Sequence, residues 1–248
     1  MKTFIQEMRE ATRDVHDISD KLVNAKLMFA MSDDSVWADG LLIFYEIFKF
    51  LEGAMTRMKD SLIGELDVEG LRRTEAFEKD LSFFMGRGWE KHYQPRPEVA
   101  AYVRYLKNLE ETDPHQLMAY IYHLYMGLLS GGQILQKKRQ LTHKFFPVFG
   151  QQVQNPTDGY EITNFHNRTI AQVKRDLAKK MNEVAAELDE ATKQKLIQES
   201  RTVFIKNNEI IRTVQGATNV VVRRVSIFLG TILLAVVITS YLFRHYSF

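Results

Sequence analysis

Apolar residues recur at helical spacing through most of the chain. In the first segment they stand four, three, four, three and four residues apart, at Phe4, Met8, Ala11, Val15, Ile18 and Leu22. Such spacing predicts one apolar stripe along a helix. The alternation typical of β-strands is not sustained over a useful length, so we predict an all-α fold of about eight helices around one core. The other predicted helices cover residues 35–63, 68–85, 98–109, 115–142, 162–188 and 190–214.

The C-terminal segment differs from the rest, because residues 225–243 include no charged side chain. As a helix this run spans roughly 28 Å, close to the hydrocarbon thickness of a thin bilayer such as the endoplasmic reticulum membrane. A buried core helix is the alternative. We expect a cytosolic domain over residues 1–215, a basic juxtamembrane linker over 216–224, a single transmembrane anchor over 225–243 and a short tail over 244–248.

Composition excludes several kinds of site. The sequence has no cysteine, which excludes disulfides, Cys-ligated zinc, iron–sulfur clusters and a Cys nucleophile. The 33 basic and 31 acidic side chains nearly balance, so no nucleic-acid partner is expected. No P-loop, Rossmann glycine pattern, G-x-S-x-G or H-E-x-x-H motif is present.

Arg9, Arg13 and His16 stand at positions i, i+4 and i+7 of the first predicted helix. They therefore share one helix face beside the apolar stripe. An imidazole there could ligate a metal while the guanidinium groups bind an anionic part of the same ligand. A solvated basic face with a histidine at its border is the alternative.

Gly127, Gly131 and Gly132 interrupt an otherwise strong helix pattern. Each glycine costs about 1 kcal/mol in a helix interior, so three of them need a reason. Either a flat ligand approaches a helix face without side chains, or another helix packs closely there. Phe204, Asn207 and Ile211 share a face of the last predicted helix of the domain, where plain core packing is the alternative to a ligand-binding wall.

Five segments stand out in chain order: EATRDVH at 10–16, EKDLSFFMGRGW at 78–89, YMGLLSGGQIL at 125–135, and residues 174–182 and 204–207. Together they resemble the haem oxygenase family over about residues 4–212. The segment at 10–16 is similar to the family's proximal-histidine helix, the segment at 125–135 to its distal helix, and the C-terminal anchor to that of the animal members.

The resemblance implies a reaction in which haem, O2 and reducing equivalents give biliverdin, CO and ferrous iron. Haem is then both cofactor and substrate, and a membrane-bound NADPH-dependent flavoprotein reductase supplies electrons at the endoplasmic reticulum surface. The implied roles are iron ligation by His16, propionate contacts from Arg9, Arg13 and Lys174, a flat distal face at Gly127, Gly131 and Gly132, a hydrophobic wall at Phe204, and a distal polar network including Tyr45 and Asn207.

Two positions depart from the family pattern at the distal helix. The family's Asp after the first distal glycine, which orients water molecules, is Leu128 here, and its Arg four residues earlier is Leu124. Leucine neither donates nor accepts a hydrogen bond, so we expect slower turnover, a mixed cleavage position or diversion to peroxidase-like chemistry, with His123 as a candidate substitute in the proton path. A propionate-side Arg of the family aligns with Ala178. The alternatives are a haem-binding protein (a buffer, sensor or peroxidase-like protein) with little cleavage, and an anchored helical tether without haem.

Overall fold

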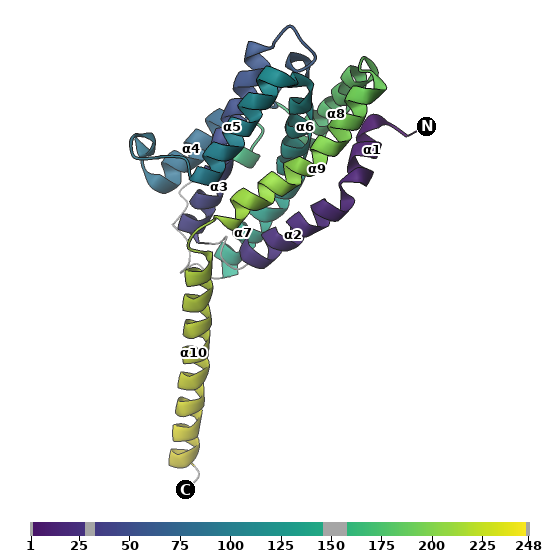
Figure 1. Cartoon of the computed structure of the whole chain (residues 1–248). Helices are drawn as coiled ribbons and strands as arrows, with labels where there is room; N and C mark the ends of the chain where they lie inside the picture. The colour runs from purple at the N-terminus through teal and green to yellow at the C-terminus, as the bar shows by residue number, and fades with distance from the viewer. Residues whose placement is uncertain (1, 28–32, 146–157, 247–248) are drawn as a thin grey trace.

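The computed structural model describes residues 2–27, 33–145 and 158–246, and within these ranges the chain is helical with no strand. Figure 1 shows a bundle of helices from which one long helix projects. The all-α prediction is therefore confirmed. The α-helices are α1 (Phe4–Ala11), α2 (Arg13–Leu27), α3 (Asp34–Arg57), α4 (Thr74–Met85), α5 (Pro97–Thr112), α6 (Leu117–Gly127), α7 (Gln133–Phe145), α8 (Ile170–Ala186), α9 (Glu190–Arg212) and α10 (Ala217–Tyr246). Short 3-10 turns lie at Gly64–Leu66, Trp89–Lys91, Pro114–Gln116 and Glu161–Thr163.

Several predicted helices have different ends in the structure. The first breaks at Thr12 into α1 and α2, and the predicted helix over 35–63 ends at Arg57. The helix predicted over 68–85 begins only at Thr74, and the one predicted from 162 begins at Ile170. Thr169 explains that later start, because its hydroxyl and the Gln172 side chain form a reciprocal capping box.

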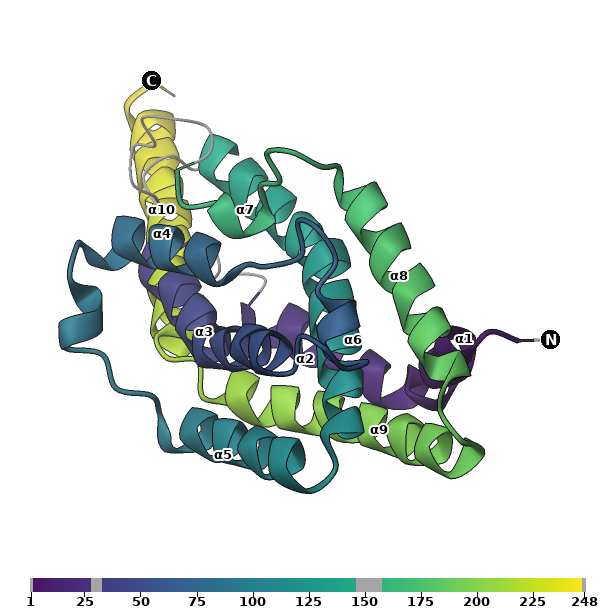
Figure 2. The same ribbon diagram turned by 90° about the horizontal axis from the view of Figure 1, so that it is seen from above.

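Helix α6 forms the centre of the domain. Its side chains from Leu117 to Ile121 are almost completely buried, and so are Tyr122 and Tyr125. A helix that is apolar on all sides is expected to be surrounded by others, and α6 contacts α3, α5, α8 and α9. Figure 2 shows α6 between α8 and α3. Its C-terminal end therefore has a fixed position.

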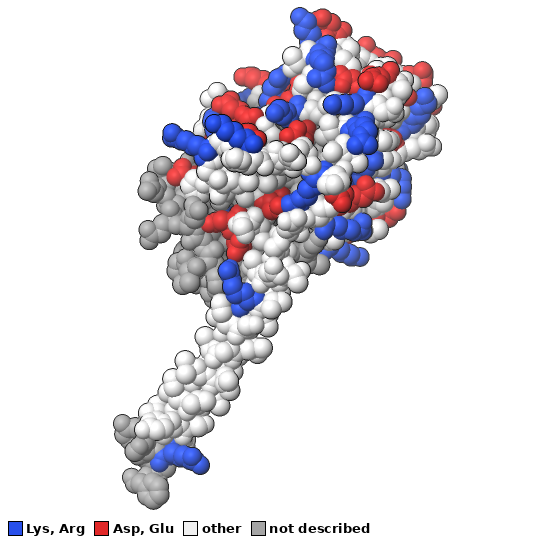
Figure 3. Space-filling view, turned by 60° about the vertical axis from the view of Figure 1, so that its left-hand side comes forward, with Lys and Arg blue, Asp and Glu red and all other residues white. Residues whose placement is uncertain are grey.

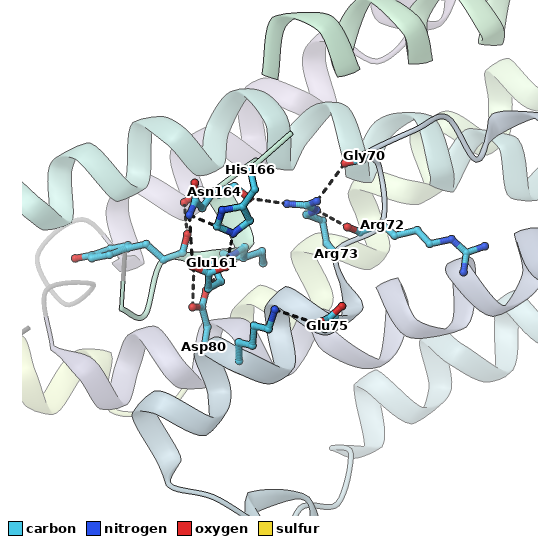
Figure 4. A network of polar contacts seen from close by, with 12 residues as sticks. Gly70, Arg72, Arg73, Glu75, Asp80, Glu161, Asn164 and His166 are labelled. Atoms are coloured by element: carbon cyan, nitrogen blue, oxygen red, sulfur yellow. Dashed lines mark hydrogen bonds and ion pairs between the residues drawn. The ribbon is translucent and has the colours of Figure 1, made fainter. Parts of the chain in front are cut away.

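A buried polar network joins α4 to the segment that precedes α8 (Figure 4). The Asp80 carboxylate, fully buried on α4, accepts hydrogen bonds from the backbone N–H groups of Glu161 at 2.8 Å and Ile162 at 3.0 Å. Burial raises the pKa of Asp80 to about 7 against the effect of these two hydrogen bonds. Arg73 contributes to the same junction, because it donates to the Asn164 carbonyl and lies over the Phe165 ring.

Helix α10 leaves the domain and carries the apolar run. Ala217–Arg244 is long and apolar enough to cross a membrane, and side chains such as Phe228 and Leu233 are about two-thirds exposed. Figure 3 shows its shaft without charged side chains between arginines near its two ends. Most of the segment predicted as a linker, residues 216–224, is helical and continuous with the run.

Candidate functional site

The break between α1 and α2 lies one turn before His16. The Thr12 hydroxyl donates to the Met8 carbonyl at 2.9 Å, which is a bond that competes with helix continuation. Arg201 on α9 donates to the freed Ala11 carbonyl at 2.6 Å and forms a bidentate pair with Asp14 at 2.7 and 2.8 Å. This contact fixes the start of α2 against α9.

His16 projects from this first part of α2 and its side chain is 54% exposed. Its Nδ1 lies 3.4 Å from the Asp20 carboxylate, one helical turn later. A carboxylate at that nitrogen orients the ring and leaves Nε2 for a ligand. The exposed imidazole is therefore accessible to a ligand, and the role of His16 as a metal ligand stays a prediction.

The glycine-rich segment after α6 is π-helical over Leu128–Gly132. Such one-turn widenings cost helix stability and occur frequently at functional sites. A Cβ atom added at Gly127 or Gly131 would meet nothing within 4 Å, apart from the helix's own backbone. These two glycines therefore face open space, which favours a ligand over close helix packing. Gly132 faces the protein instead, because its Cβ would lie 3.1 Å from Leu128 and 3.2 Å from Thr163.

Phe204 on α9 links His16 to His123 of α6. Its ring centroid lies 5.5 Å from that of His16 and 5.1 Å from that of His123. His123 precedes Gly127 by four residues and so shares its helix face. The exposed imidazole, the phenyl ring and the bare glycine face thus line one region between α2, α6 and α9.

His123 is half-buried, and its imidazole is held neutral there. Its Nε2 atom has no hydrogen-bond partner within the described residues. Burial, with smaller contributions from His16 and Arg9, lowers the pKa of His123 to about 3. Because the Nε2 atom is itself shielded from solvent, a bound molecule or water reaches it only after a neighbouring side chain moves.

Cationic side chains border the same region. Arg9 donates to the Tyr122 hydroxyl at 3.1 Å, and Lys174 of α8 donates to the Ser130 hydroxyl of the π-helical segment at 2.8 Å. Arg13 is exposed one turn before His16. Positive charge on α1, α2 and α8 suits an anionic group on a ligand that lies against the glycine face.

Two predicted site residues have partners elsewhere. Tyr45 is buried and donates to the Glu78 carboxylate at 2.8 Å, and burial together with this bond raises the pKa of Tyr45. Asn207 accepts a hydrogen bond from the Tyr102 hydroxyl at 3.1 Å. Within the described residues, no contact brings either side chain to His16, so their roles in a distal polar network stay predictions.

Apolar side chains occupy the positions that depart from the family pattern. Leu124 is buried in the core, and Leu128 packs beside Gly132. Ala178 is half-buried on α8, and the neighbouring Lys179 and Lys180 pair with Glu183. The distal face therefore has no carboxylate or guanidinium at these positions.

Sequence reasoning missed three residues that support this region. Asp20 could have been found from its i+4 spacing to His16. Tyr122 and Ser130 gave no sequence signal, because each supports the region through one cation from a distant helix. A separate pocket of about 400 Å³ lies between α7 and the start of α8, lined by residues such as Gln136, Thr163 and Arg168, and includes none of the predicted site residues.

The region fits haem on these observations. An exposed imidazole can ligate iron, two glycines leave a helix face without side chains, and cations at the edge match two carboxylates. None of these features requires a rearranged core, since Gly127 and Gly131 already face open space.

Comparison with known proteins agrees with this assignment. A sequence model of the family described as "Heme oxygenase" matches residues 2–213. The chain is 29% identical over 219 residues to human "Heme oxygenase 1", covering 85% of this chain and 71% of the human protein. It is 25% identical over 221 residues to "Heme oxygenase 2" of Synechocystis, covering 87% and 84% of the two chains.

Solved structures show the same fold. Heme oxygenase 2 from Chlamydomonas reinhardtii without heme superposes with a TM-score of 0.75 at 24% identity, covering 86% of this chain and 98% of that one. Heme oxygenase-1 from Synechocystis in complex with heme superposes with a TM-score of 0.77 at 22% identity, covering 94% and 100%.

Proposed function

Because the chain belongs to the haem oxygenase family, we propose that it cleaves haem oxidatively to biliverdin, CO and ferrous iron. O2 is the oxidant, and a membrane-bound NADPH-dependent flavoprotein reductase supplies the electrons. The observation that carries this proposal is the open face at Gly127 and Gly131 in the region lined by the exposed imidazole of His16.

His16 is the residue that ligates the iron in this proposal. Its exposure, and the Asp20 carboxylate 3.4 Å from Nδ1, support Nε2 as the ligating atom. Arg9, Arg13 and Lys174 bind the two propionates, since all three are cations at the border of the region. Phe204 forms an apolar wall that excludes water from one side.

Bound haem supplies the iron that activates O2, and the protein controls the arrival of protons. Leu124 and Leu128 offer no group that holds a water molecule. His123 has a neutral imidazole on the same helix face as the glycines, and we propose that it partly replaces the missing polar residues. Proton delivery is then slower than in a site with a carboxylate, and so is turnover.

The same two leucines favour a second candidate function. A haem-binding protein with little or no cleavage, serving as a buffer, sensor or peroxidase-like protein, needs the imidazole and the bare glycine face but not the distal polar residues. The two functions share a site and differ only in the fate of the bound haem.

Helix α10 supports membrane attachment of the enzyme. Its exposed apolar side chains would be unfavourable in water over such a length. We propose that α10 spans the endoplasmic reticulum membrane with the helical domain on the cytosolic face, where a membrane-bound reductase can reach it.

Turnover with a reductase tests the proposal. Full-length protein in detergent micelles is saturated with haemin and mixed with NADPH and a microsomal flavoprotein reductase under air. We expect the Soret band to decay and a bilin to form, more slowly than with human heme oxygenase 1. A Soret band that forms with the protein and persists without any bilin would instead support the second function.

A further inference from the structure

The first turn of α3 holds two other helices at one corner of the domain. Asp33, the N-cap residue, accepts a hydrogen bond from Arg223 of α10 at 3.0 Å. The adjacent Asp34 forms an ion pair with the buried Arg139 of α7. The Arg139 guanidinium also lies 5.3 Å from the centroid of the Trp37 ring, on α3. Helices α7 and α10 therefore have fixed positions relative to one another.

The link between α9 and α10 is short and firmly attached. It contains four residues, 213–216, of which Gly216 has a left-handed φ of 77°. Asp39 accepts from the Gln215 backbone N–H at 2.8 Å and also pairs with Arg96, which in turn donates to the Thr213 carbonyl at 2.7 Å.

The first turn of α10 is also packed into the domain. Ala217 and Val220 are buried, at 4% and 6% exposure. A flexible tether would have neither buried side chains nor this set of hydrogen bonds. The start of α10 is thus part of the folded domain, and the direction of α10 sets the orientation of the domain.

One face of α7 is exposed, apolar and basic. Ile134 and Leu141 are 55% and 54% exposed, and they stand seven residues apart with the exposed Lys137 and Lys138 between them. These four residues share a single helix face. The α7 segment has no acidic side chain, and two of its four Lys and Arg residues, Lys137 and Lys138, are exposed on this face, whereas Arg139 is buried. Figures 1 and 2 place α7 at the end of the domain where α10 begins.

We propose that this face of α7 lies on the lipid headgroups of the membrane that α10 enters, so that the domain sits on the bilayer in one orientation. The inference rests on the proposed membrane anchor. An anionic bilayer surface is the partner that fits, because apolar side chains flanked by lysines are typical of interfacial helices. The contacts of Asp33 with α10 and of Asp34 with α7 hold this face of α7 close to the start of α10.

The absence of native cysteine allows a direct test with single-cysteine variants of the full chain. Ile134→Cys and Leu141→Cys report on α7. Ala191→Cys is the matched control on an exposed helix position, about 32 Å along α9 from Arg212. Each carries a bimane fluorophore and is reconstituted into phosphatidylcholine vesicles with about 30% phosphatidylserine. Quenching by lipids that carry a nitroxide on the headgroup is measured, and resistance to alkaline carbonate extraction reports insertion.

We expect quenching at positions 134 and 141 to exceed that at position 191 at least about threefold, and to weaken without phosphatidylserine. The double substitution Asp33→Asn and Asp39→Asn removes two anchoring charges while asparagine keeps the N-cap. It should halve the quenching at position 141 and leave insertion unchanged. If the protein resists carbonate but quenching is equally weak at all three positions, α7 does not lie on the bilayer, while the membrane anchor stands. Extraction of the unsubstituted protein by carbonate would overturn the membrane anchor itself, and this inference with it.

Discussion

Substituting Gly131 with leucine separates the stability of the domain from its capacity to bind haem. A Cβ atom at this position meets nothing within 4 Å, so the added side chain enters open space and causes no clash in the ligand-free protein. Replacing glycine by a good helix former stabilises a helix by up to about 1 kcal/mol. We therefore expect the ligand-free variant to be as stable as the parent protein or more stable by about 0.5–1 kcal/mol. The same side chain occupies the space that a flat macrocycle needs, and haem affinity should fall at least about tenfold, or 1.4 kcal/mol.

Gly132→Ala is the matched control, because this glycine faces the protein. Its Cβ would lie 3.2 Å from Thr163, whose hydroxyl is held by Gln136 and by the Tyr160 carbonyl. We expect Gly132→Ala to lower the free energy of unfolding by about 1 kcal/mol, since overpacking outweighs the helix propensity of alanine. Urea unfolding of the ligand-free proteins and haemin titration at the Soret band measure both quantities. Haemin binding by Gly131→Leu as tight as that of the parent protein would rule out haem against this face. Unfolding as easy as that of Gly132→Ala would show that the space beside Gly131 is not open.

Three further perturbations test other parts of the structure. Burial raises the pKa of Asp80 to about 7, above its ordinary 3.8. The contribution of Asp80 to stability therefore falls by up to about 4 kcal/mol as the pH rises from about 4 to 7. Asp80→Asn should flatten the pH dependence of the free energy of urea unfolding in that window, and an unchanged profile would contradict this. Leu128→Asp should increase the rate of bilin formation at least about tenfold if proton delivery limits turnover, whereas an equal rate would show that Leu128 is not limiting. Arg201→Gln removes the contacts that fix the start of α2 and should weaken haem binding by less than about tenfold, measured by haemin titration, and no change would mean that His16 is positioned without it.

Helices such as α1 and α2 could be predicted because the apolar stripe that they bury is visible in the sequence, whereas α6 and α10 stand out as nearly continuous apolar runs. The break at Thr12 could not be predicted, since it depends on a guanidinium that arrives from Arg201, 190 residues along the chain from Ala11. The start of α4 at Thr74 has a similar cause, because the Glu52 carboxylate accepts from the backbone N–H groups of Arg73 and Thr74.

For the candidate site, the side chains along one helix were easier to predict than their partners. The helix interruption at Gly127 and Gly131 follows from the cost of glycine in a helix, and the structure shows it as a π-helical turn beside open space. Gly132 faces the protein because it lies against Thr163, far along the chain, and this contact gave no sequence signal. Likewise, Tyr45 and its partner Glu78 are brought together only by the packing of α3 against α4.

Haem is proposed to lie between the imidazole of His16 and the bare helix face at Gly127 and Gly131. A crystal structure of the full-length protein with haemin, phased on the iron anomalous signal, measures this most directly. We predict iron at bonding distance from Nε2 of His16, about 2 Å, with the porphyrin plane against Gly127 and Gly131. Iron anywhere else, such as in the pocket beside Gln136 and Arg168, or a porphyrin held without His16, would show that haem does not bind between His16 and the glycines.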